Sequence, residues 1–260
     1  MMEEGKVYHA FIEGYGSDGT GIARIDGMVV FVKHGIRDEL VDVFVEHVGH
    51  HAAWGRVVKV IQPCPGRRQP DCPHYAVCGG CQFRHMNYAE ELEAKRIRVE
   101  DALRRIGGAE IRVPKIWGAA RIDRYRNKVQ LPVSDQAIGY YRARTHQVVD
   151  IDDCLLQPER ANACRRAVRE WMNVYQVPAY REKEHKGLIR HLYLRFNQAG
   201  ETLCCLVVNG RSVPHGDALV ELLRAADPGL AGVVLSVNTR RTNVILGDSY
   251  VTLWGRDWLE

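Results

Sequence analysis

Short hydrophobic runs separated by turn residues fill the first 62 residues of the chain. Apolar and polar positions alternate over stretches such as 6–12 and 39–45, and Asp26-Gly27 lies between two apolar runs as a typical hairpin turn. Five such strands in about sixty residues favour a small closed barrel, because closure removes the unpaired edges that isolated strands expose. The pattern therefore predicts an OB-like β-barrel over residues 1–62.

A helical period replaces the alternation after residue 87. Asn87 and Glu90 form a capping-box-like start, and Gly107-Gly108 is a typical helix end. The apolar residues that share one face of this predicted helix are Leu92, Val99, Leu103 and Ile106. We expect residues 63–110 to form a small loop-plus-helix segment that follows the barrel.

Strands and helices are mixed over residues 111–260. The predicted strands are 124–133, 137–142, 148–151, 188–196, 202–209, 232–238, 242–246 and 250–253. Helices are predicted from Pro158 to about Tyr175 and over 217–226, since apolar residues recur there at helical spacing. The fold class expected for the whole chain is α+β, with three domains at 1–62, 63–110 and 111–260.

The overall composition is that of an ordinary globular protein, with 46% hydrophobic and 26% charged residues. No apolar run approaches the roughly 18 residues that a membrane-spanning helix needs, and the first residues lack the features of a signal peptide. We therefore expect a cytoplasmic protein without a membrane partner, and we expect a monomer.

Positive charge is concentrated in the middle of the chain. The formal net charge is only +4, but between Lys95 and Gln147 thirteen Lys or Arg residues stand against five Asp or Glu residues. Such a balance is typical of a surface that faces phosphates, although a solvated face can also carry it. The candidate nucleic-acid contacts are Arg124, Arg126, Lys128, Arg142 and Arg144.

Three cysteines fall within ten residues, as Cys72, Cys78 and Cys81 in the spacing C-x5-C-x2-C. Thiolates crowd together when they share a metal or an iron–sulfur cluster, because the metal offsets their repulsion. A four-cysteine site would need one more ligand. The candidates are Cys64, Cys154, Cys164, Cys204 and Cys205. Of these, we expect Cys164, on the apolar stripe of the helix after Pro158, and Cys204 and Cys205, in the strand at 202–209, to be buried and structural.

Zinc and iron–sulfur chemistry are both open at this point. Structural zinc sites usually present two close ligand pairs, whereas only Cys78 and Cys81 form such a pair here. A 4Fe–4S cluster accepts three cysteines from one loop and a distant fourth, which suits Cys154 after the strand at 148–151. His74 and His85 could serve as ligands to zinc instead.

Residues 19–45 resemble a known domain. The segments are Gly19-Thr20-Gly21-Ile22-Ala23-Arg24, Asp26-Gly27-Met28-Val29-Val30-Phe31-Val32 and Val41-Asp42-Val43-Phe44-Val45. They resemble the TRAM domain, an OB-like barrel attached to RNA-modifying enzymes. An SH3-like or OB-like barrel of another purpose would give a similar pattern.

Three further segments carry a resemblance that covers almost the whole chain. They are the cysteine loop from Cys72 to His85, Arg124-Tyr125-Arg126-Asn127-Lys128, and Val149 to Cys154. Together they resemble the RumA (RlmD) branch of the RNA uracil-5-methyltransferases. The resemblance implies a 4Fe–4S cluster on Cys72, Cys78, Cys81 and Cys154, S-adenosylmethionine as methyl donor, and methylation of uridine C5 in 23S ribosomal RNA.

In that family a Rossmann-like domain catalyses methyl transfer. We see no D-x-x-x-G-x-G-type loop after a strand and no candidate nucleophile. The sequence therefore predicts that the catalytic domain is absent and that the 260 residues are an inactive RNA-recognition portion. Three alternatives stay open: a non-catalytic TRAM and iron–sulfur protein that binds RNA or acts as a sensor, a fragment of a transfer-RNA uracil-5-methyltransferase, and a zinc-binding RNA protein.

Overall fold

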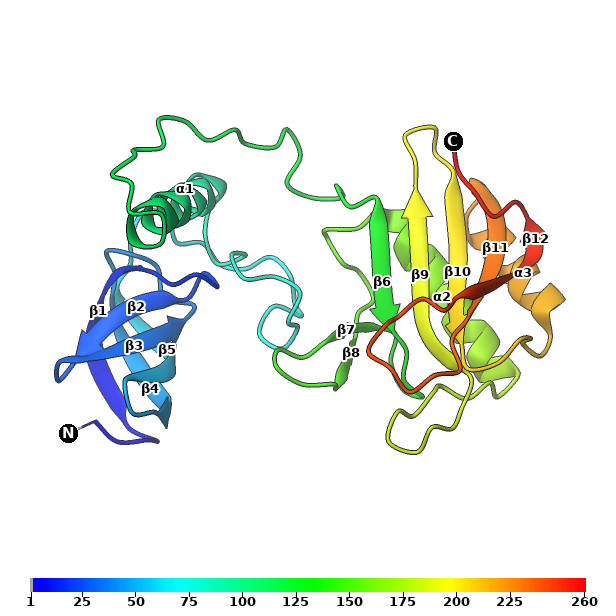
Figure 1. The fold of residues 1–260 in the computed structure, drawn as a ribbon, viewed down its shortest axis with the longest axis horizontal. Coiled ribbons are helices and arrows are strands. Elements are labelled where there is room, and N and C mark those ends of the chain that lie inside the picture. Colours follow the sequence, from blue (N-terminus) through cyan, green and yellow to red (C-terminus); the bar gives the residue numbers. More distant parts are fainter. Residues whose placement is uncertain (1) are drawn as a thin grey trace. The chain divides into compact units, whose positions relative to one another are not determined.

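A computed structural model describes residues 2–260 of the chain, which form two compact units. Unit 1 contains the residues up to Tyr75 together with Cys81–Ala120, and unit 2 contains Ala76–Gly80 together with Arg121–Glu260. Figure 1 shows the elements of each unit. The division into three domains at 1–62, 63–110 and 111–260 stays a prediction.

Unit 1 is built on a closed five-stranded barrel with strand order β1-β2-β3-β5-β4. The strands are β1 (Val7–Tyr15), β2 (Gly21–Ile25), β3 (Met28–Lys33), β4 (Leu40–Val48) and β5 (Ala52–Gln62). Asp26 and Gly27 join β2 to β3 with positive φ angles of 49° and 79°, as a primed hairpin turn requires. Alternate side chains such as Ile12, Val30 and Val43 fill the interior. The predicted barrel is confirmed.

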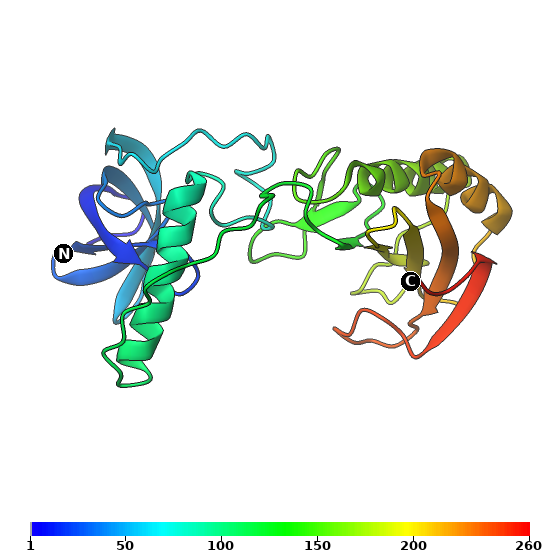
Figure 2. The same cartoon turned by 90° about the horizontal axis from the view of Figure 1, so that it is seen from above.

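Helix α1 (Tyr88–Arg105) packs against the barrel, but not through the predicted face. The buried contacts come from Ala94 and the partly buried Ile97, whereas Val99 is 50% and Ile106 88% exposed. The predicted apolar face is therefore wrong at those two positions. The small apolar cluster that joins α1 to the barrel contains Ala94 and Ile97 but neither Val99 nor Ile106. Figure 2 shows the helix beside the barrel.

The start of α1 is only half of a capping box. The Asn87 side chain accepts a hydrogen bond from the Glu90 backbone N–H at 2.9 Å, as predicted. The Glu90 carboxylate does not return to Asn87 but accepts from the Tyr15 hydroxyl of β1. The tertiary contact between helix and barrel thus replaces the local one.

Unit 2 is a five-stranded sheet with helices on one face. The strands, in the order β12-β11-β10-β9-β6, are β12 (Ser249–Gly255), β11 (Leu230–Val237), β10 (Thr202–Val208), β9 (Ile189–Phe196) and β6 (Lys128–Pro132). Only β10 and β11 pair in parallel, joined through α3 (Gly216–Ala226). Helices α2 (Glu159–Val174) and α3 cover the same face, as Figure 2 shows, and Trp171, Leu192 and Leu219 lie in the core between them. A small hairpin, β7 (Gly139–Tyr141) and β8 (Val148–Asp150), completes the unit.

The strand predicted at residues 242–246 is wrong, because that segment is a loop. The Asn238 side chain donates to the carbonyl groups of Val244 and Ile245, at 2.7 and 3.0 Å. The buried Arg190 guanidinium donates to the Arg240 carbonyl at 2.8 Å. Side chains therefore satisfy backbone groups that a sheet ladder would otherwise pair. In the described part of the chain, no helix is long and apolar enough to cross a membrane.

Candidate functional site

The four predicted cluster ligands are divided between the two units. Cys72 and Cys81 belong to unit 1, whereas Cys78 and Cys154 belong to unit 2. Among residues 2–260, no group of three or more His, Cys, Asp or Glu side chains is placed to hold a metal ion. The complete ligand set therefore stays a prediction.

Within unit 2, Cys78 and Cys154 both interact electrostatically with the phenol of Tyr140. Burial raises the pKa of Tyr140 to about 12, and the negative charges of Cys154 and Cys78 contribute to this rise. The segment 76–80 reaches the β7–β8 hairpin through the Gly79 N–H, which donates to the Tyr141 carbonyl at 2.9 Å. A Cβ on Gly79 would lie 2.9 Å from that oxygen, so this contact requires glycine.

The sulfur of Cys78 also receives a backbone donor. The Gly80 N–H lies 3.3 Å from the Cys78 Sγ. Hydrogen bonds of this kind favour a thiolate over a thiol, and they are common around thiolates that bind metal. The chemistry of the donor set in unit 2 thus fits thiolate ligation, with two cysteines near one tyrosine and an amide directed at one sulfur.

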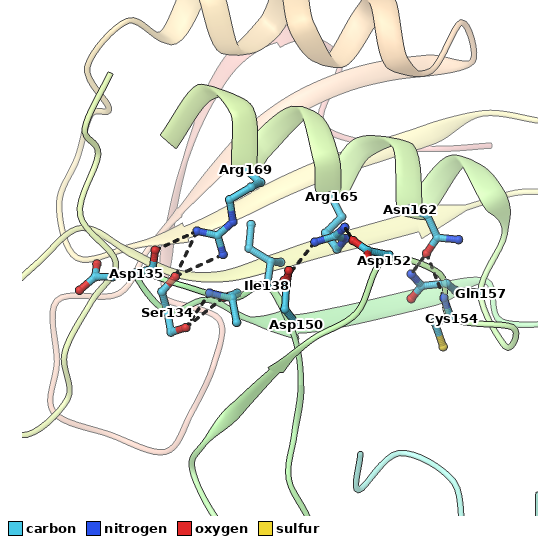
Figure 3. A network of polar contacts seen from close by, with 11 residues as sticks. Ser134, Asp135, Ile138, Asp150, Asp152, Cys154, Gln157, Asn162, Arg165 and Arg169 are labelled. Atoms are coloured by element: carbon cyan, nitrogen blue, oxygen red, sulfur yellow. Dashed lines mark hydrogen bonds and ion pairs between the residues drawn. The ribbon is translucent and has the colours of Figure 1, made fainter. Parts of the chain in front are cut away.

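A buried polar network fixes the loop that carries Cys154, whose side chain is 8% exposed. The Cys154 N–H donates to Asn162 Oδ1 at 3.4 Å, and its carbonyl accepts from Arg124 Nη1 at 2.9 Å. Asn162 also bonds Asp153 and Gln157, each at 2.5 Å. Figure 3 shows Asn162 on α2 directed at Cys154 and Gln157. The backbone of Cys154 is therefore held from both sides.

Two arginines continue this network along α2. The Arg165 side chain, only 3% exposed, donates to Asp150 at 3.1 Å and to Asp152 at 2.9 Å. Arg169 donates to the Asp135 carbonyl at 3.1 Å, as drawn in Figure 3. Sequence reasoning missed these residues. Their signal was a polar row, Asn162, Arg165 and Arg169, at helical spacing beside the apolar face of α2.

The remaining cysteines of unit 2 lie in the core, as the sequence predicts. Cys164 and Cys204 are fully buried, and Cys205 is 6% exposed. Burial raises the pKa of Cys164 and of Cys205 to about 12, and it also raises that of Cys204. Because the thiolate is the reactive and metal-binding form, these three thiols are inert.

In unit 1, two histidines pack around Tyr75. The Tyr75 hydroxyl lies 2.6 Å from His85 Nδ1 and donates to the Gln82 carbonyl at 2.9 Å. Burial lowers the pKa of His85 to about 3 and that of His34 to about 4, so both rings are neutral near pH 7. The Nδ1 atom of His85 is thus already hydrogen-bonded to Tyr75.

The five predicted RNA contacts have different surroundings. Arg124 is bound by Asp153 at 2.6 Å and by the carbonyls of Cys154 and Gln157, so it stabilises the Cys154 loop. Arg142 and Arg144 are exposed on the turn after β7. Only Arg126 and Lys128 come together at a concave surface.

That surface is an open groove of about 580 Å³, lined by Tyr125, Arg126, Asn127, Lys128, Gln130 and Tyr140. Tyr125 is 56% exposed, whereas Arg126 donates to the Tyr140 hydroxyl at 2.9 Å and lies over its ring. The groove thus combines an exposed aromatic ring, two cations and two amide side chains. Sequence reasoning missed the role of Tyr125, Asn127 and Gln130, although they lie in the same segment as the predicted basic residues.

The barrel of unit 1 matches a known domain. Residues 2–58 match the family model for the TRAM domain. This match covers most of the predicted barrel at 1–62 and confirms the domain that its glycine and valine pattern resembles.

Related sequences match nearly the whole chain. A protein of Clostridium tetani described as an uncharacterized RNA methyltransferase is 36% identical over 98% of this chain and 57% of its own length. One from Caldanaerobacter subterraneus with the same description is 36% identical over 98% of this chain and 58% of its own length. The chain thus spans a little more than half the length of these curated relatives.

The fold also matches a solved structure, described as the tRNA (uracil-54, C5)-methyltransferase of Pyrococcus abyssi in complex with S-adenosyl-L-homocysteine. The TM-score is 0.73 at 21% identity, and the match covers 96% of this chain and 56% of the other. At this identity the match shows that the fold is shared.

These matches correct two predictions from the sequence. The absence of a catalytic domain, and the inactivity derived from it, are contradicted by relatives named as methyltransferases that align with 98% of the chain and by a methyltransferase fold that aligns with 96% of it. Both predictions rested on a loop motif and a nucleophile that we did not find in one sequence. A missing motif is weak ground, because very different sequences build one fold, as 21% identity at a TM-score of 0.73 illustrates.

Proposed function

We propose that the chain functions in an S-adenosylmethionine-dependent RNA uracil-5-methyltransferase and that its groove in unit 2 binds RNA. The observation that carries the proposal is the set of groove residues, Tyr125, Arg126 and Lys128, in a chain with a TRAM domain. Relatives named as RNA methyltransferases and a neighbour solved with S-adenosyl-L-homocysteine support the reaction and its methyl donor.

The groove has the groups that unpaired RNA requires. The exposed ring of Tyr125 can stack on a base, and base stacking on an aromatic side chain is worth about 1–3 kcal/mol. Lys128 can neutralise a phosphate, whereas the amides of Asn127 and Gln130 can both donate to and accept from base edges. Arg126 keeps Tyr140 in place rather than standing free, since it donates to the Tyr140 hydroxyl at 2.9 Å.

Binding is tested with a single-stranded RNA oligonucleotide and the variant Tyr125→Ala. We expect the variant to bind about tenfold more weakly, because about 1.4 kcal/mol of stacking is lost. Tyr250→Ala serves as a control, since Tyr250 has a similar exposure of 53% on β12, outside the groove. Equal affinities for wild type and both variants would remove the groove from the proposal.

We propose 23S ribosomal RNA as the substrate, on the combination of TRAM domain and cysteine loop. The alternative is transfer RNA, which the name of the Pyrococcus abyssi neighbour states for that protein. The two are separated by supplying the full protein with labelled S-adenosylmethionine and either RNA. Label in ribosomal RNA at uridine C5 is the expected result, and label in transfer RNA alone would favour the alternative.

We also propose that Cys72, Cys78, Cys81 and Cys154 hold a 4Fe–4S cluster. The hydrogen bond from Gly80 to Cys78 and the proximity of Cys78 and Cys154 to Tyr140 support thiolate chemistry at this place. A bound cluster would cross-link the cysteine loop to the strand end at Cys154. The protein's own contribution is to hold the Cys154 backbone through Arg124 and Asn162.

The metal assignment is tested on anaerobically purified protein. Four iron and four sulfide per chain, with broad visible absorbance, are expected for the wild type. Cys154→Ser should lose them, and Cys205→Ser should keep them because Cys205 lies in the core of unit 2. A colourless protein with stoichiometric zinc would reject the cluster.

A further inference from the structure

Two cations face each other across neighbouring strands of unit 2. Lys128 on β6 and Arg195 on β9 are direct partners in the antiparallel register. The residues next to them, Val129 and Leu194, point into the core beneath α2. Since side chains alternate along a strand, Lys128 and Arg195 point to the face of the sheet that the helices leave open.

This arrangement is unfavourable without a counter-ion. Like charges directly opposite on antiparallel strands destabilise a sheet. Both side chains are exposed, and within residues 2–260 neither of them has an acidic ion-pair partner. The Arg195 Nε instead donates to the Tyr193 hydroxyl at 3.0 Å, and the guanidinium lies 5.7 Å from the centre of that ring. The pair therefore leaves its positive charge uncompensated.

The cations continue the groove described above. Lys128 and Gln130 line the groove, and their register partners on β9 are Arg195 and Tyr193. A cation and an aromatic ring thus continue the groove surface from β6 onto the adjacent strand. None of the groove lining comes from β9, so Tyr193 and Arg195 lie just outside it.

We propose that Lys128 and Arg195 form a phosphate clamp for the RNA backbone, with Tyr193 beside it as a second stacking surface. The clamp rests on the proposed RNA-binding function and extends it, because it directs the bound RNA from Tyr125 across β6 and onto β9. A phosphodiester between the two cations replaces their repulsion with two attractions. An extended strand is the ligand that fits, since the cations continue a groove already lined by an exposed ring and amides.

The clamp is tested by RNA affinity over a range of salt concentrations with the full chain and a single-stranded RNA oligonucleotide. The variants are Lys128→Ala, Arg195→Ala and the double substitution. Each single variant should bind about fivefold more weakly at 0.1 M salt, and the salt slope should fall by about 0.7, which corresponds to one phosphate contact on single-stranded RNA.

Thermal stability without RNA provides a second readout. Either substitution removes the cross-strand repulsion, so the melting temperature should stay equal or rise while affinity falls. If the residues had a merely structural role, their substitution would lower both the melting temperature and the RNA affinity. Inorganic phosphate should raise the melting temperature of the wild type more than that of the double variant.

Lys183→Ala and Arg211→Ala are the matched controls. Both residues are exposed in loops of unit 2. Arg211 follows the C-terminal end of β10, whereas Arg195 pairs with Leu203 near the N-terminal end of that strand. Neither control should change affinity or salt slope beyond twofold.

Three results would overturn the clamp. Wild-type RNA binding that Arg195→Ala leaves unchanged would reject the clamp and leave the proposed function intact. Equal losses of RNA affinity in the control variants would show that affinity depends on the net charge of the protein and not on the positions of these two cations. A wild type that binds no RNA at low salt, while phosphate still stabilises it through both cations, would reject RNA as the ligand and the proposed groove with it.

Discussion

At the scale of single residues, the most constrained charge in unit 1 is Glu39, whose side chain is fully buried. It accepts from Arg67 Nε at 2.5 Å and from the backbone N–H groups of Ile36 and Cys64, at 3.1 and 3.3 Å. Arg67 also donates to the His34 carbonyl at 2.7 Å. This pair attaches the segment before the cysteine loop to the turn between β3 and β4.

Replacing Arg67 with Met should destabilise the protein by about 3–5 kcal/mol, because it leaves a buried carboxylate without its cation. Urea unfolding measures the loss. Arg56→Ala is the control, since its ion pair with Glu46 is about half exposed on both sides and should contribute less than about 1 kcal/mol. Similar losses in the two variants would contradict the special role of Glu39.

His191 on β9 is a partly buried base, and loss of solvent around its ring lowers its pKa from 6.5 to about 4. The unfolded chain therefore binds a proton near pH 6.5 that the folded chain does not bind until about pH 4. Stability from this residue is complete above pH 6.5 and is lost as the pH falls toward 4. In His191→Phe, the free energy of unfolding should depend less on pH between 6.5 and 4. If the free energy of unfolding of the variant depended on pH as steeply as that of the wild type, the pKa of His191 would not be lowered in the folded protein.

At the scale of elements, α2 positions the Cys154 loop mainly through Asn162. Asn162 is 3% exposed and bonds Asp153, Cys154 and Gln157, so its amide satisfies groups on both sides of the loop. Arg124 reaches the same loop from the segment before β6. Helix α2 and the segment before β6 thus both contact the loop at Cys154.

Asn162→Ala should destabilise unit 2 by about 1–3 kcal/mol, because it leaves buried donors and acceptors without partners. It should also speed the reaction of the Cys154 thiol with a thiol-specific reagent in metal-free protein, since the loop opens more often. Asn173→Ala, at an exposed position of the same helix, is the control for helix propensity. Equal reaction rates in both variants would mean that Asn162 does not restrain the loop.

At the scale of the whole molecule, the two compact units contain cations of two kinds, those held in internal ion pairs and those left exposed. Arg67 is partly buried and Arg165 is buried, each in an ion pair, whereas Lys128 and Arg195 are exposed without acidic partners among residues 2–260. The net charge of +4 conceals this difference. Only the second kind of cation can attract RNA at little cost, because it breaks no internal ion pair on binding.

The sequence by itself predicted the elements that local patterns define. The barrel strands, the Asp26-Gly27 turn, the Asn87 cap and helices α2 and α3 follow from alternation, turn chemistry and helical period, all of which act between residues a few positions apart. The burial of Cys164, Cys204 and Cys205 also followed, since their neighbours in sequence are apolar.

Only the tertiary structure decided which side chains meet across long separations. It assigned Arg124 to the Cys154 loop rather than to a free surface, exposed Val99 and Ile106, and placed Arg195 opposite Lys128, sixty-seven positions away in sequence. The physical reason is that local patterns specify the direction and period of an element, whereas strand register and helix docking select its partners. The chemistry of the candidate RNA surface arises from that selection.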